Sequence, residues 1–380
     1  MKNICLLTVF YSVFLFSAKA QAQGKDSLLT QTEEIATPKV TVGGYVDTYF
    51  GYDLSRPASK DRPYFVSSAR HNEFTINLAF VDVKYNGERV RGAFKPAIGT
   101  YMAANYAAEP AMFRNILEAN VGIKLFKTKD IWLDAGVFVS PFTNESPVSM
   151  DQLAYTRSYA PEYVPYYISG LKLTTPLSEK LTAYVYLLNG WQNIVENNQG
   201  KSGALQLEYK PVEKVLLNWN LYVGDERTPS APINRTRVFT DVFAVFNPNG
   251  KFSGTTSLYV GAQQRADTLT GNGNGEEDSK MVYWHNANII GRYKITPSFS
   301  LTGRLEYFND PNSVQITPVT GVNGFSTFSS SLGINWKVAE KALLRLESRS
   351  FLSQKEVYVN KDGTPSNYGQ LLIGSMAISF

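Results

Sequence analysis

The sequence predicts an all-β protein: a transmembrane, antiparallel, up-and-down β-barrel of about sixteen strands, with short periplasmic turns and long external loops. Three observations predict this fold. Apolar and polar residues alternate with a period of two through most of the chain. The connections between the alternating stretches are short and long by turns. Residues 1–22 have the features of a secretory signal peptide.

The signal peptide is predicted from the order of its residues. Lys2 is followed by an apolar run over residues 4–16, and then by small residues at alternate positions up to Ala22. The apolar run is shorter than the roughly 20 residues of a membrane-spanning helix. Residues 23–39 are mostly polar, and we expect them to form a periplasmic lead-in to a barrel that occupies residues 40–380.

The strands are clearest in the second half of the chain. Between residues 300 and 308, Leu301 and Leu305 alternate with Arg304 and Glu306, as in a strand with one apolar face and one polar face in contact with water. All the predicted strands have the length of tilted transmembrane strands, which need about 9–11 residues. They are residues 40–53, 70–85, 89–105, 114–126, 130–142, 164–175, 180–191, 202–210, 214–224, 234–247, 251–265, 281–294, 299–309, 323–337, 341–353 and 367–380.

The connections provide a second test of the fold. Those after even-numbered strands are short and polar, for example residues 126–130 and 247–251, whereas most of those after odd-numbered strands are longer. An outer-membrane barrel requires this alternation, and a soluble sandwich does not. The last strand would pair with the first to remove free edges. The terminal aromatic residue, Phe380, resembles the signal that the barrel-assembly machinery recognises, which places the chain in the outer membrane of a diderm bacterium.

Composition excludes some functions. Charged residues make up 18% of the chain, below the roughly 25% of an average soluble protein. The formal net charge is only +4, and two of the lysines, Lys2 and Lys19, fall in the signal peptide. Such a balance argues against nucleic acid as a partner. The one cysteine, Cys5, also lies in the signal peptide, so we expect no disulfide in the mature chain.

No enzymatic activity, metal or cofactor is predicted. His71 and His285 are the two histidines, and no G-x-S-x-G nucleophile motif occurs. A phospholipase-like barrel, which needs a serine paired with a histidine, remains an alternative. The acidic residues 276–278 do not have the spacing of a calcium loop.

Several stretches, mostly in the first half, resemble a known family. They are "EFTINLAFVDVKYN" (73–86), "GTYMAANYAAEP" (99–110), "LDAGVFVSPFTNES" (133–146), "DQLAYTRSYAPEYVPYYISGLKL" (151–173) and "NGWQNI" (189–194). They are similar to the OmpL-like β-barrel porins common in Bacteroidetes. The resemblance implies passive diffusion of small hydrophilic solutes through a water-filled lumen. Its partners would be outer-membrane lipid and small polar solutes, and other sixteen-stranded porins are often homo-trimers. A substrate-selective channel for sugars or anions and a plugged structural or adhesive barrel remain alternatives.

The alternation also predicts which charged side chains face the lumen. Basic residues outnumber acidic ones among them, and rings of Arg and Lys favour anions. The other interpretation is that these are ordinary wet side chains neutralised by loops. The lumen-wall candidates are Arg89, Arg91, Lys95, Glu208, Lys210, Arg235, Arg237, Asp241, Arg292, Lys294, Arg304, Glu306, Arg345, Glu347 and Arg349.

The longest connection, residues 143–163, is the predicted third external loop. In other sixteen-stranded porins this loop folds into the lumen and narrows it, and the alternative is an exposed loop. Its charged residues, Glu145, Asp151, Arg157 and Glu162, are the pore-constriction candidates. Opposed charges across a constriction would order polar solutes and filter them by size and charge.

Aromatic residues cluster in "GYVDTYFGY" (44–52), "VPYY" (164–167) and "MVYW" (281–284). We expect them to form the interfacial girdles that every outer-membrane barrel carries. A sugar-stacking path inside the pore is the functional alternative.

Overall fold

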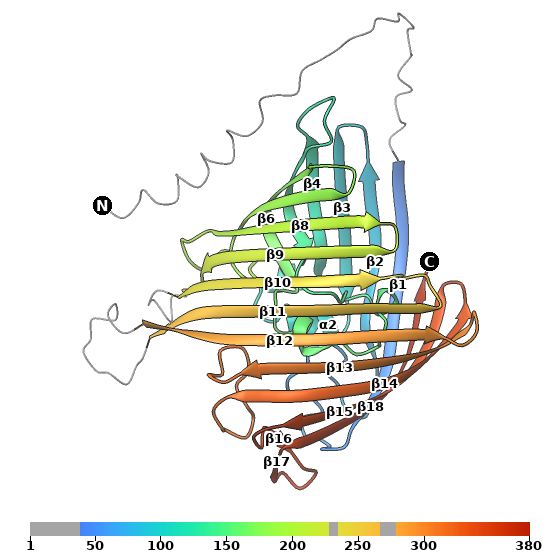
Figure 1. Cartoon of the computed structure of the whole chain (residues 1–380), viewed down its shortest axis with the longest axis vertical. Coiled ribbons are helices and arrows are strands. Elements are labelled where there is room, and N and C mark those ends of the chain that lie inside the picture. Colours follow the sequence, from blue (N-terminus) through green and yellow to red (C-terminus); the bar gives the residue numbers. More distant parts are fainter. Residues whose placement is uncertain (1–38, 228–234, 267–278) are drawn as a thin grey trace, which may run out of the picture. The chain divides into compact units, whose positions relative to one another are not determined.

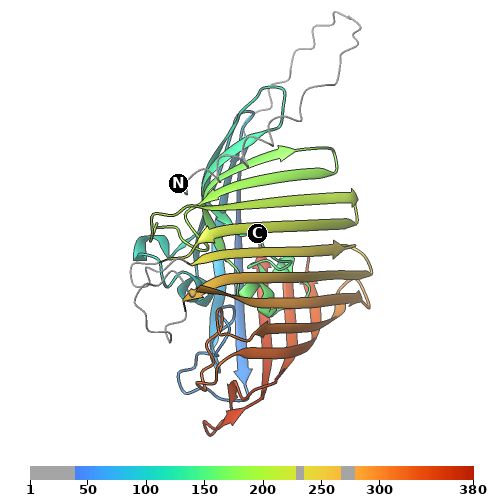
Figure 2. The ribbon, with the colours of Figure 1, turned by 60° about the vertical axis from the view of Figure 1, so that its left-hand side comes forward.

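A computed structural model of the chain describes residues 39–227, 235–266 and 279–380. The predicted signal peptide, nearly all of the lead-in and the acidic residues 276–278 lie outside them. Within the described residues, sixteen strands form one closed antiparallel barrel. Figures 1 and 2 show these strands side by side in chain order around the barrel. The predicted fold class is therefore confirmed.

Every predicted strand has a counterpart in the barrel. The barrel strands are β1 (Lys39–Asp53), β2 (Phe74–Asn86), β3 (Val90–Ile98), β4 (Ile116–Lys124), β5 (Trp132–Val139), β6 (Tyr167–Pro176), β7 (Leu181–Leu188), β8 (Ser202–Val212), β9 (Val215–Asp225), β10 (Thr236–Phe246), β11 (Phe252–Ala266), β12 (Ser279–Lys294), β13 (Phe299–Asp310), β14 (Phe325–Ala339), β15 (Ala342–Ser353) and β18 (Tyr368–Ser379).

The main difference lies after β3. The strand predicted over residues 89–105 ends at Ile98, and helix α2 (Thr100–Asn105) follows. Gly99 has a φ of 127°, and a Cβ on it would lie 2.4 Å from the carbonyl oxygen of Asn77. Only glycine fits this close approach, which turns the chain out of the strand. The predicted loop 354–366 also contains a short hairpin, β16 (Tyr358–Val359) and β17 (Pro365–Ser366).

The remaining helical segments are single turns in the external connections. They are η2 (Ala111–Phe113), η3 (Ser149–Asp151) and α3 (Tyr159–Glu162). Within the described parts of the chain, no helix is both long enough and apolar enough to cross a membrane.

The barrel closes between its first and last strands. β1 pairs with β18 from Tyr45 opposite Ser379 to Asp53 opposite Leu371. Beyond this ladder, the backbones of Gly44 and Phe380 exchange two hydrogen bonds of 2.9 and 3.0 Å. The edges that would otherwise be exposed to lipid are thereby paired, as a transmembrane sheet requires.

The core of this protein lies inside the barrel, because external loops fold into the lumen. Large aromatic side chains from the external half of the inner wall pack against these loops. The girdle prediction was therefore wrong for most of these aromatic residues, including Tyr166, which packs against the cluster inside the barrel. Tyr45, Tyr49, Tyr167 and Trp284 are buried in the lumen, whereas Tyr283 faces outward. The period of two sends alternate residues to opposite faces, so a run of aromatics cannot belong wholly to a girdle.

Candidate functional site

The loop L3, residues 140–166, lies along the inside of the barrel wall. The side chain of Asn220 on β9 donates to the carbonyl oxygen of Pro141 at 3.0 Å. The carboxylate of Asp241 on β10 accepts from the amide of Thr143 at 3.1 Å. Asn144 then donates to Thr255 on β11 and to Asn288 on β12, both at 3.0 Å. The first part of L3 is thus hydrogen-bonded to four successive strands.

Glu347 on β15 holds the middle of L3. Its carboxylate accepts hydrogen bonds from the amides of Tyr155 and Thr156, both at 2.9 Å, and from the Thr156 hydroxyl at 2.6 Å. Arg304 on β13 pairs with the same carboxylate at 2.9 Å and donates to the Thr156 carbonyl oxygen at 2.6 Å. Both charged side chains are buried. A wall ion pair therefore anchors the loop backbone.

A second ion pair, between Arg349 on β15 and Glu306 on β13, holds the next turn of L3. Glu306 accepts from the amide of Tyr159 at 2.7 Å, and Arg349 donates to the carbonyl oxygen of Arg157 at 2.6 Å. The guanidinium of Arg349 also lies 5.3 Å from the ring centroid of Tyr159. Such charge-assisted bonds are stronger than neutral ones.

The tip of L3 reaches β15 and β1. Arg345 donates to the carbonyl oxygens of Gln152 and Ala154 at 3.0 and 2.9 Å. The hydroxyls of Tyr45 and Ser149 lie 2.9 Å apart. L3 therefore covers the inner wall from β9 around to β1, with β18 between β15 and β1.

Three of the four constriction candidates are buried in this packing. Glu145 accepts from the amide of Ser158 at 3.0 Å, and burial raises the pKa of its carboxyl against the opposing effect of Arg304. Arg157 donates to the carbonyl oxygen of Pro161 at 3.1 Å. Glu162 accepts from the amide of Val66 at 2.8 Å. These residues fix the shape of L3.

Asp151 differs from the other three candidates. It is exposed at the tip of L3, and the described residues give its carboxylate no hydrogen bond or ion pair. Its carboxylate interacts electrostatically with the positive charges of Lys95 on β3 and Arg345 on β15. Burial by the surrounding wall nevertheless raises its pKa. Asp151 is thus a solvent-accessible carboxylate inside the barrel, with cations on both sides.

The wall from β2 to β8 carries charges that pair with one another, of which Arg91, Glu118 and Asp82 are partly exposed and Asp134 and Lys95 are buried. Arg91 on β3 binds Asp134 on β5 at 2.5 Å, and Lys95 binds Glu118 on β4 at 3.1 Å and Asp82 on β2 at 3.4 Å. The sequence prediction included the two cations and missed the three acids. The acids lie in early strands whose alternation is irregular, although each occupies the polar phase of its strand.

Five further wall candidates lie at rims or have a polar partner. Arg89 is exposed in the periplasmic turn before β3, and Arg235 is exposed just outside β10. Glu208 and Lys210 pair at 2.8 Å. Arg237 donates to Gln263 at 2.9 Å. At these positions, the predicted excess of basic charge is therefore at a rim or is offset by an acid or an amide oxygen.

A second loop, L1 (residues 54–73), covers part of the external mouth. The Phe65 ring lies 5.0 Å from Tyr159 of L3, centroid to centroid. The guanidinium groups of Arg62 and Arg349 each lie 4.8 Å from the same Phe65 centroid. L1 and L3 are therefore packed together as one aromatic and cationic cluster.

Neither histidine has the surroundings of a catalytic base. The Nδ1 atom of His71 accepts from the amide of Asp53 at 2.9 Å, and burial lowers the pKa of the imidazole. His285 faces outward on β12, with its ring centroid 5.9 Å from that of Tyr307. Among the described residues, no serine hydroxyl is hydrogen-bonded to either ring.

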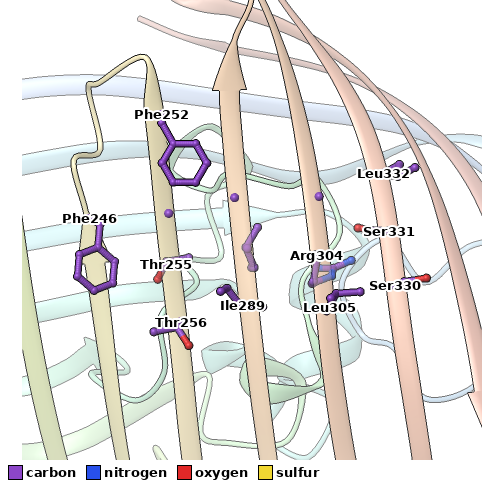
Figure 3. A pocket seen from close by; sticks show the side chains of 14 residues that line it. Phe246, Phe252, Thr255, Thr256, Ile289, Arg304, Leu305, Ser330, Ser331 and Leu332 are labelled. Atoms are coloured by element: carbon purple, nitrogen blue, oxygen red, sulfur yellow. The ribbon is translucent and has the colours of Figure 1, made fainter.

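The outer face carries an apolar groove of about 630 Å³ across β10 to β14 (Figure 3). Its floor is a row of three glycines: Gly254 pairs with Gly291, and Gly291 with Gly303. A Cβ added at any of them would meet no atom closer than 3.6 Å. The barrel itself therefore does not require glycine at these positions.

Comparison with known proteins gives consistent results. A profile of the family described as "Putative beta-barrel porin-2, OmpL-like" matches residues 39–380. No curated protein sequence matches the chain.

Solved structures with the same fold have low sequence identity. The outer-membrane channel DcaP of Acinetobacter baumannii has a TM-score of 0.61 and 11% identity, covering 90% of this chain and 97% of that one. An anion-selective porin from Comamonas acidovorans has a TM-score of 0.56 and 10% identity, covering 90% and 100%. A trimer form of OmpT of Vibrio cholerae has a TM-score of 0.58 and 10% identity, covering 90% and 99%. At such identities the likeness shows the fold alone.

Proposed function

The chain belongs to the OmpL-like β-barrel porin family and is an outer-membrane porin; we propose that it lets small hydrophilic solutes diffuse past Asp151, along the inner wall of β2 to β8. One observation carries this proposal. L3 covers the wall from β9 to β1, whereas Arg91, Glu118 and Asp82 on the wall opposite stay partly exposed, outside the area on which helix α2 packs.

Weak charge selectivity follows from the same geometry. Cations and acids alternate along the open wall, in the pairs Arg91–Asp134 and Lys95–Glu118. Paired charges can replace part of the hydration shell of either sign of ion. We expect the section beside Asp151, where L3 occupies part of the lumen, to filter solutes mainly by size.

The direct test is single-channel recording of the refolded mature protein in a planar bilayer. We expect stable open steps and, under a salt gradient, a small reversal potential. A large reversal potential would contradict weak selectivity and favour a selective channel. A barrel that migrates in its folded, heat-modifiable form and yet does not conduct would contradict the pore and favour a plugged barrel.

We also propose that the barrel assembles as a homo-trimer through the outer-face groove. The glycine floor lets another surface approach closely, as small residues do in membrane interfaces. The solved trimer of a porin-fold neighbour supports such an arrangement.

Filling the groove should dissociate the trimer. The double substitution Gly254→Leu/Gly291→Leu removes the recess, and Ala262→Leu/Ala287→Leu adds similar bulk on the same two strands outside it. Light scattering of the detergent-extracted protein should show trimers for the wild type and the control, and monomers for the groove variant. The same oligomer in all three would refute this interface.

A further inference from the structure

Charges inside the barrel are paired almost everywhere, and one group of cations is an exception. At the periplasmic end of β12 to β15, no ion pair is described for Arg292, Lys294, Lys337 or Arg345, whereas Arg91, Lys95, Arg304 and Arg349 on other parts of the wall each pair with an acid. The four lie on the inward-facing phase of their strands, like Asn288 and Asn335.

These four side chains line one cavity of about 280 Å³, which we name the basic pocket. Its only acidic lining residue is Glu340, and its neutral lining includes the polar residues Asn249, Thr296, Ser298, Ser300 and Asn335. The tip of L3 lies above it, since Met150 also lines the cavity.

The hydrogen bonds of the cationic groups go to neutral acceptors. Arg292 donates to the carbonyl oxygen of Pro248 at 2.6 Å, and Lys294 to that of Asn249 at 2.9 Å. Arg345 donates to two L3 carbonyl oxygens. The Nε atoms of Arg292 and Arg345 are buried without a partner in the described residues. The carboxylates of Asp47, Glu347 and Asp151 also act on Arg345, and Glu340 lines the pocket. Arg292, Lys294 and Lys337 have at most carbonyl dipoles to offset their charge, so the lining as a whole keeps an excess of positive charge.

We propose that the basic pocket binds a small oxyanion with two negative charges, of the class of inorganic phosphate and simple phosphate esters. Attraction to the cations grows with the charge of the ligand, which favours a divalent anion over chloride. The volume lies at the small end for ligand sites, which excludes oligosaccharides. The inward phase of the cations favours a solute from the lumen over a lipid headgroup.

The inference deepens the proposed function, because it names a solute class that would pause at the periplasmic end of the same lumen. Its test does not depend on conduction. Equilibrium dialysis with radiolabelled inorganic phosphate measures binding to the refolded mature barrel in a neutral detergent. We expect one saturable site per chain. A barrel that conducts without binding phosphate refutes the pocket alone, and one that binds without conducting refutes the diffusion pore alone.

The decisive variant is Lys294→Gln/Lys337→Gln. It removes two of the four charges and spares the arginines that hold L3 and the turn, so the fold should be kept. We expect phosphate affinity to fall about tenfold. The matched control is Lys127→Gln/Lys129→Gln, which removes two exposed lysines at another periplasmic turn and should leave affinity unchanged. Equal loss in both variants, or no saturable binding to the wild type, would overturn the proposal.

A final experiment distinguishes free phosphate from a lipid headgroup as the ligand. Phosphatidylglycerol added to the micelles should not change the affinity for free phosphate if the pocket opens to the lumen. Competition by the lipid would instead show a headgroup site and would overturn the assignment to a diffusing solute.

Discussion

Replacing Glu347 by alanine should free L3 from the barrel wall and raise the single-channel conductance severalfold. The substitution takes away the acceptor of two L3 amides and of the Thr156 hydroxyl, and it leaves the buried Arg304 without its partner. Removing one member of a buried pair costs about 3–5 kcal/mol. We expect this cost to be relieved by detachment of the loop, since the ladders of β14, β15 and β18 do not involve the Glu347 side chain.

The measurement combines conductance with limited proteolysis. In the variant, L3 should become cleavable while the barrel remains heat-modifiable, and the open steps should be larger and noisier. Glu208→Ala is the matched control, because Glu208 is also an inner-wall carboxylate but pairs only with Lys210 and touches no part of L3. An unchanged step size and a resistant loop in Glu347→Ala would show that L3 does not restrict the pore.

The sequence could predict which side chains of this site face inward, but not which of them contact a loop. Period-two alternation correctly assigned Arg304, Glu306 and Glu347 to the inner face, because a residue's phase in a strand decides its side of the sheet. The same pattern cannot say whether an inward charge meets water or a folded loop. That depends on contacts such as Glu347 with Thr156, which are far apart in the chain.

The constriction candidates illustrate the same limit. The length and position of the predicted loop 143–163 indicated that it enters the lumen, and the structure describes it there. Its four charged residues look alike in sequence. Only the packing distinguishes Glu162, which caps amides of L1, from Asp151, which is exposed at the tip. Similarly, the strand expected over residues 99–105 was wrong. The chain leaves the strand at Gly99 through its local backbone conformation, which the pattern of apolar residues cannot predict.

Reversing the charge of the exposed carboxylate should change which ions the pore prefers. Asp151→Lys would place a third cation beside Lys95 and Arg345. For an ion passing about 8 Å away, a two-unit change of charge stabilises a monovalent anion and destabilises a cation by about 1 kcal/mol each in water. The anion-to-cation permeability ratio would then rise about thirtyfold without screening, and by about threefold to fivefold at physiological salt, where the Debye length is about 8 Å. The reversal potential under a salt gradient measures this ratio. Asp362→Lys, on an exposed external loop, is the matched control and should shift the ratio little.

Acidification should also raise the anion-to-cation permeability ratio of the wild type. Burial raises the pKa of Asp151, so this carboxyl takes up a proton at a higher pH than an ordinary one and then loses its negative charge. The anion-to-cation permeability ratio should therefore increase on acidification, beginning at a higher pH than an ordinary aspartate would give. In Asp151→Asn, which is neutral throughout, the ratio should start higher and the pH-dependent rise should be largely lost. If this variant and the wild type respond to pH alike, the titrating group lies elsewhere and Asp151 does not set the selectivity.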